Sequence, residues 1–172
     1  IHVQIKNAIS QSRLAAPLLS RAHRVEKMIS GVFGEALNDT FNFITTGPIA
    51  EREQVKLNFN QRDLTIDESS ETEMLVRVNK ERRDRGLREL VSDLKLRDLS
   101  RVYGRDMFER GFFSHYSPEG TSPFDRMEAV DISYFTAGEN LALAPNVTIA
   151  HDGLMDSKGH RENILNPDFG KV

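Results

Sequence analysis

The 172-residue chain contains no cysteine, so disulfide bonds cannot stabilise it, and this absence leaves its compartment open. It also lacks any apolar run close to the ~20 residues that a membrane-spanning helix requires. Its formal net charge of −3 gives no reason to expect nucleic acid as a partner. What remains, 38% hydrophobic and 28% charged residues, indicates one globular domain with an appendage.

The start of the chain lacks two further features. Ile1 is not an initiator methionine, and the basic, apolar and small-residue pattern of a signal peptide is missing. We therefore expect the sequence to be a piece of a longer protein.

Residues 1–66 are predicted to form a helical segment followed by an extended connector. Up to about residue 36, apolar residues recur at helical spacing, with a break expected at Pro17. Gly47-Pro48 then marks a turn within the connector. This basic segment either packs on the following domain as a helical hairpin or follows a membrane tether located upstream of Ile1.

Residues 67–172 are predicted to form the domain itself. Acidic residues after Asp67 favour a helix that runs to about Arg85, with Asn79 and Arg82 expected at its surface. Caps and apolar spacing predict further helices from Ser92 or Asp93 to Gly111, from Pro123 to about Val130, and from Val147 to about Ser157. The apolar face of the first of these helices is expected to comprise Leu96, Leu99, Val102, Tyr103 and Met107. Leu141–Ala144 is expected to be a strand, and Gly159 is expected to leave His160 on a loop.

The main chemical signal is a group of histidines around one glutamate. His115, His151 and His160 are three of the five histidines in the chain, and Glu139 lies between them. Imidazole and carboxylate groups bind borderline metals and move protons near neutral pH. Each residue also has a structural interpretation, as a buried hydrogen-bonded side chain or a backbone cap.

Three motifs carry a family resemblance. SHYSP at 114–118, GENLALA at 138–144 and SKGHRENIL at 157–165 resemble, in order and spacing, the bacterial branch of the CAP superfamily of cysteine-rich secretory, antigen 5 and pathogenesis-related proteins. The resemblance covers the chain from about Glu71 onward. It implies an α+β fold, an α-β-α sandwich with a small antiparallel sheet, here preceded by the N-terminal helical segment. That segment faintly resembles the tail of the colicin V production family of membrane proteins.

The same resemblance implies that His115, Glu139 and His160 meet in one cleft and would be its catalytic residues if it were an enzyme. Many relatives add a second glutamate, which this chain lacks, and helix-face geometry favours His151 in its place. These four side chains would suit zinc or a similar divalent metal. Asn140, Arg161 and Asn163 are expected to support the site, and Arg126 or Arg161 to neutralise Glu139 or Asp156.

The function implied is that of an extracytoplasmic cell-envelope domain whose cleft binds a divalent metal and a small or lipid-like ligand. One alternative is a hydrolase in which the metal or a His–Glu pair activates water, and another is an interaction module with a vestigial cleft. We favour a non-enzymatic domain because no nucleophile stands out. The sequence indicates neither the ligand nor an oligomeric state.

The expected strand at Leu141–Ala144 needs partners that the end of the chain does not provide. In the resembled family further strands follow the last motif, so these strands are predicted to lie beyond Val172. Alternatively, the connector from Phe41 to Phe59 supplies the pairing. We prefer continuation past Val172, with Val55–Phe59 added as an extra edge strand because its apolar and polar residues alternate.

Overall fold

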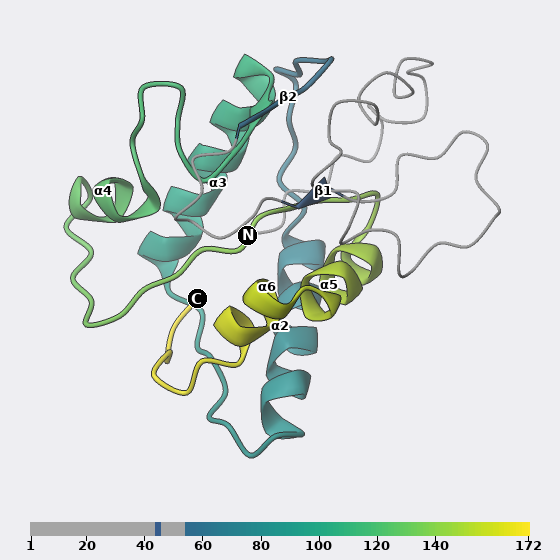
Figure 1. The fold of residues 1–172 in the computed structure, drawn as a ribbon, viewed down its shortest axis with the longest axis vertical. Coiled ribbons are helices and arrows are strands. Elements are labelled where there is room, and N and C mark those ends of the chain that lie inside the picture. The colour runs from purple at the N-terminus through teal and green to yellow at the C-terminus, as the bar shows by residue number, and fades with distance from the viewer. Residues whose placement is uncertain (1–43, 46–53) are drawn as a thin grey trace, which may run out of the picture.

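The computed structural model describes residues 44–45 and 54–172, so the predicted helix over residues 1–36 lies outside the described part. The described elements are, in chain order, β1 (Ile44–Thr45), β2 (Val55–Lys56), α2 (Glu68–Arg83), α3 (Leu94–Arg110), β3 (Phe112–Phe113), α4 (Pro123–Glu128), β4 (Ala142–Leu143), α5 (Val147–Asp156) and α6 (Lys158–Ile164). Figure 1 shows α3 and α4 on one side and α2, α5 and α6 together on the other, with β1 above α2 and α5. This arrangement is the predicted α+β architecture of helices around short antiparallel strands.

The helix limits follow from capping side chains. Asp67 accepts a hydrogen bond from the backbone N–H of Ser70 at the start of α2, and Asp93 does the same for Lys95 and Leu96 at the start of α3. Ser122 and Asp125 form a reciprocal capping box on α4. The left-handed conformation of Gly111, with φ of 71°, ends α3.

The expected loop position of His160 is wrong. The chain turns at Ser157 and enters α6 directly, so His160 is buried in the first half of a short helix. Gly159 is tolerated there because a helix interior only disfavours glycine by about 1 kcal/mol and tertiary packing can outweigh that cost.

The expected surface position of Asn79 and Arg82 is also wrong. Both are buried in α2, whereas Met74, Leu75 and Val78 are only partly buried. The Asn79 side chain donates to the carbonyl of Leu90 and accepts from its N–H. The inward face of α2 is therefore polar because it binds backbone groups of neighbouring segments, which apolar spacing cannot indicate.

The strands form two antiparallel pairs. The predicted strand after Glu139 is confirmed as β4, and its partner is β1, with Ile44 opposite Leu143. The strand β2 pairs with β3, with Val55 opposite Phe113. Of the two alternatives raised by the sequence, the connector thus supplies pairing to β4, and its Val55-Lys56 part adds to β3.

The core lies where these strands meet α3. Its buried apolar cluster comprises Leu57, Tyr103, Met107, Phe108, Phe112, Phe113, Leu141 and Leu143. Val102 was expected on the same helix face but is 67% exposed. Within residues 44–45 and 54–172, no helix is both long and apolar enough to cross a bilayer.

Candidate functional site

His115 and Glu139 are in direct contact. His115 follows β3 by two residues and Glu139 precedes β4 by three, and their side chains are 2% and 8% exposed. The imidazole Nδ1 of His115 lies 2.7 Å from Oε1 of Glu139. A carboxylate at this position orients the ring and favours the proton on Nδ1, which makes Nε2 the electron-pair donor of His115.

Arg126 binds the other oxygen of the same carboxylate. Its Nη2 donates to Oε2 of Glu139 at 2.8 Å, while Nη1 donates to the carbonyls of His115 and Thr121, each at 3.0 Å. The guanidinium carbon lies 3.4 Å from the centroid of the Tyr103 ring, a cation–π contact. The sequence named Arg126 as a partner for Glu139, and the structure places it there.

Tyr103 is the site residue that sequence reasoning missed. It was predicted only as part of the apolar face of α3, and it is indeed buried. Its hydroxyl donates to the carbonyl of Ser114 at 2.8 Å, and burial raises the pKa of Tyr103, so that it keeps this proton. Helical spacing could have predicted its burial, but no local signal shows that its ring supports Arg126.

His160 lies close enough to His115 for the two rings to interact electrostatically. Burial, and secondarily the neighbouring His115, lowers the pKa of His160 to about 4. Its Nδ1 is 2.7 Å from the hydroxyl of Ser157 at the start of α6. His160 is therefore neutral at physiological pH, with its ring orientation set by Ser157.

This pKa predicts acid sensitivity of the metal-free protein. Between pH about 6.5 and about 4, the unfolded chain binds a proton that folded His160 excludes. The contribution of His160 to the free energy of unfolding is fully present above the pKa that His160 has in the unfolded chain. It decreases as the pH falls towards 4, by on the order of 3 kcal/mol. Urea unfolding in EDTA at pH 7 and pH 4.5 should show a smaller loss for His160→Gln than for the unmodified protein; equal losses would contradict this assignment.

Asn140 and Asn163 connect the second and third motifs. The Asn140 side chain donates to the carbonyl of His160 at 3.1 Å, and the Asn163 side chain donates to Oδ1 of Asn140 at 2.9 Å. A side chain at Gly138 would place its Cβ 2.2 Å from Oδ1 of Asn163, so the glycine permits this close approach. Arg161 instead binds backbone carbonyls at the end of α5, those of Met155 and Asp156.

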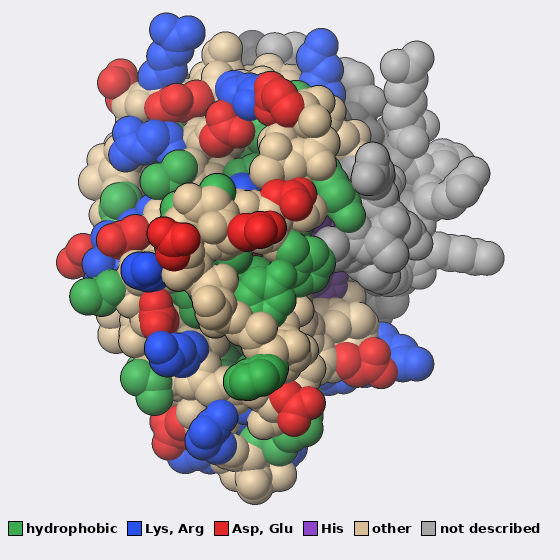
Figure 2. Space-filling model, turned by 90° about the vertical axis from the view of Figure 1, so that its left-hand side faces the viewer, with side chains coloured by type: hydrophobic (Ala, Val, Ile, Leu, Met, Phe, Trp, Pro, Cys, Tyr) green, Lys and Arg blue, Asp and Glu red, His purple; other side chains and the backbone are tan. Residues whose placement is uncertain are grey.

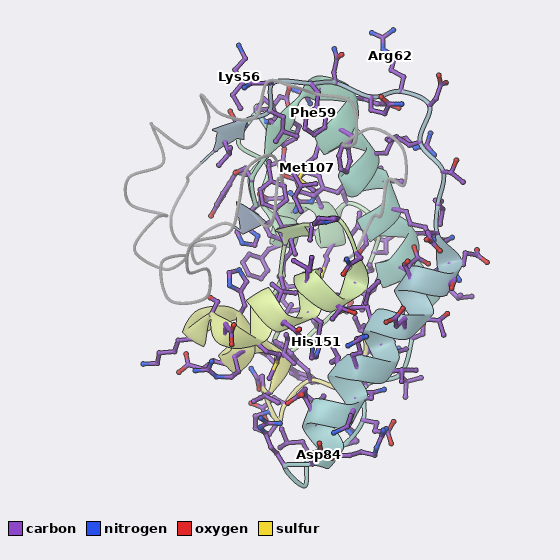
Figure 3. All side chains as sticks on the ribbon, turned by 90° about the vertical axis from the view of Figure 1, so that its right-hand side faces the viewer. Lys56, Phe59, Arg62, Asp84, Met107 and His151 are labelled. Carbon is purple, nitrogen blue, oxygen red and sulfur yellow. The ribbon has the colours of Figure 1, made fainter. Side chains whose placement is uncertain are left out.

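His151 lies on α5, and it is buried as the helix-face argument predicted (Figure 3). Its Nδ1 is 3.2 Å from a carboxylate oxygen of Asp152, and its Nε2 has no hydrogen-bond partner among the described residues. In the described part of the chain, no three His, Cys, Asp or Glu side chains are arranged to hold one metal ion. The Glu139 carboxylate is bonded to His115 and Arg126.

Two serines beside His115 hold the backbone of this motif. The hydroxyl of Ser114, a residue only 1% exposed, accepts from the N–H of Tyr116, and that of Ser117 accepts from the N–H of Thr121.

Figure 2 shows a face on which acidic and basic side chains alternate and histidine contributes only small areas. The three histidines among the described residues, His115, His151 and His160, are buried.

Helices around short antiparallel strands, with histidine, glutamate and histidine from three ordered motifs, define a CAP-type domain. The model of the CAP family, the cysteine-rich secretory protein family, matches residues 75–172, and the chain belongs to this family. The match begins slightly after the predicted boundary at residue 67.

Two relatives come from Bacillus subtilis (strain 168). The uncharacterised protein YkwD is 42% identical over 98 residues, which are 55% of this chain and 37% of the relative. The uncharacterised membrane protein YlbC is 33% identical over 105 residues, 60% of this chain and 30% of the relative. The chain thus spans about a third of each relative, and no solved structure matches it.

Proposed function

We propose that this CAP domain acts in the cell envelope, outside the cytoplasm, as a binding domain for a divalent metal, with zinc as the metal, and for a small or lipid-like ligand. The observation that supports this most is the pairing of His115 with Glu139 at 2.7 Å beside a neutral His160. One of the two relatives is named a membrane protein, which favours a place at the envelope.

The residues present fit a two-histidine site. The Nδ1 atoms of His115 and His160 are engaged by Glu139 and Ser157, so a metal would take the Nε2 atom of each ring. Carboxylate–histidine pairs of this kind are the usual outer shell of zinc sites. Glu139 would then orient His115 without being a ligand itself, and His151 would take no part.

Two protein ligands leave coordination positions for solvent or for a ligand with oxygen or nitrogen donors. When bound, zinc would supply a positive charge that polarises such a donor. Arg126 holds the Glu139 carboxylate in place, and the Tyr103 ring packs against the guanidinium of Arg126. These contacts fix the orientation of the His115 ring before a ligand binds.

Calorimetry on protein purified without a chelator or a histidine tag tests this proposal. We expect one zinc ion to bind at pH 7.5, with affinity decreasing below pH about 6 because protons compete for imidazole nitrogen. Magnesium serves as the control, since it prefers oxygen ligands and should give no heat. An absence of both heat and thermal stabilisation with zinc would overturn the proposal.

A further inference from the structure

A segment outside the family match is built into the core of the domain. Residues 54–61 precede the matched region, which begins at residue 75. Here exposed and inward positions alternate, with Leu57 only 5% exposed. Figure 3 shows Phe59 directed toward α3, whereas Lys56 and Arg62 point away from the protein.

Backbone hydrogen bonds attach this segment to the strand that leads to His115. Val55 and Lys56 pair with Phe113 and Phe112, and the N–H of Leu57 donates to the carbonyl of Gly111 at 2.8 Å. The N–H of Gln61 donates to the carbonyl of Phe108 at 3.0 Å. In the described part of the chain, β2 is the one strand paired with β3.

Leu57 also joins the two sides of the site. It belongs to the buried cluster that contains Phe113 and Leu141. Phe113 lies two residues before His115, and Leu141 lies two residues after Glu139. Leu57, Phe113 and Leu141 also line one small cavity, so neighbouring atoms would not replace the contacts of a shortened Leu57 side chain.

We propose that residues 54–61 are a positioning element of the site, in which Leu57 holds β3 and the start of β4 so that His115 and Glu139 stay in contact. This inference rests on the proposed function only for its effect on metal affinity. The other constraints on His115 come from within the family match: the Ser114 carbonyl bonded by Tyr103 and the His115 carbonyl bonded by Arg126.

Four variants of the full chain, Leu57→Ala, Leu57→Met, Leu90→Ala and Lys56→Ala, separate positioning from general packing. Leu57→Ala removes the proposed contact. Leu90→Ala is the matched control, because Leu90 is equally enclosed at 8% exposure and bonds to Asn79 in another part of the domain. Lys56→Ala removes an outward side chain from the same strand.

The readouts are the imidazole 15N resonances of His115 and the zinc affinity, with the melting temperature recorded for each variant. We expect Leu57→Ala to shift the His115 resonances and to weaken zinc binding about tenfold, as loss of outer-shell support does. Leu90→Ala should lower the melting temperature with both readouts unchanged, Lys56→Ala should change nothing, and Leu57→Met should restore both readouts.

Equal effects of Leu57→Ala and Leu90→Ala on His115 would overturn the inference. If Leu57→Ala does not fold, Leu57→Val takes its place, and unshifted His115 resonances in that variant are equally contradictory. If the unmodified protein binds no zinc, the proposed function fails, while the His115 resonances still decide whether Leu57 positions this ring.

Discussion

Replacing Arg82 with methionine is expected to lower the free energy of unfolding by about 3–5 kcal/mol, the range seen when a buried charge network loses one member. Arg82 is 0% exposed. Its guanidinium donates to the carbonyls of Arg88, Ile164, Asn166 and Phe169. Without it, these carbonyls lose their donor, and three of them belong to the last segment of the chain.

Among the described residues, the buried charge is compensated by carbonyl dipoles and not by a carboxylate. Burial lowers the pKa of Arg82, which reflects the cost of removing the cation from water. The carbonyl of Ile164 lies at the C-terminal end of α6, where the helix dipole favours a positive charge. Arg82 therefore connects the third motif to α2 by hydrogen bonds.

Urea unfolding at neutral pH measures this effect, with Arg83→Met as the matched control. Arg83 is half exposed and pairs with Glu89, so its loss should cost within about 0.5 kcal/mol. An equally small loss in the free energy of unfolding for both variants would contradict the conclusion that buried Arg82 holds the C-terminal segment against α2.

Replacing either His115 or His160 with alanine is expected to weaken zinc binding by on the order of 100-fold or more. Outer-shell changes at metal sites already cost about 10–100-fold, and these two residues are the proposed ligands themselves. Glu139→Gln, which removes the charge that orients His115, should fall within that outer-shell range. Competition with a chelating dye measures all three variants.

His151→Ala is the control for these variants. His151 is as enclosed as His160, at 6% exposure each, but the hydrogen-bond partner of its side chain among the described residues is Asp152. Its removal should leave zinc affinity unchanged. A loss as large as that for His160→Ala would mean that zinc binding gathers all three histidines, as the sequence had suggested.

Local signals predicted the parts of the fold that depend on nearby residues. Asp67, Asp93, Ser122 and Asn146 each cap the helix expected after them, because a cap needs only a side chain and the next turn. The motif order correctly placed Glu139 beside His115. The position of His151 relative to these residues could not be predicted in this way. The helix-face argument predicts that His151 is buried but not which residues surround it.

The features that sequence reasoning missed depend on distant partners. A strand as short as Ile44–Thr45 has no recognisable periodicity. The sequence therefore offered no reason to prefer its pairing with Ala142–Leu143 over pairing by strands predicted beyond Val172. Arg82 looked like a surface arginine because three of the four backbone carbonyls that it binds lie more than 80 residues away and have no sequence signature. Likewise, Tyr103 was predicted to be buried but not to stack on Arg126.

The central claim is that two histidines, oriented by Glu139 and Ser157, bind the metal through their Nε2 atoms. Imidazole 15N spectra during a zinc titration at pH 7.5 test it most directly. The account predicts that the Nε2 resonances of His115 and His160 move together and stop at one equivalent, while those of His151 stay in place. Movement of the His151 resonances with the other two, or no movement of His115 and His160, would contradict it.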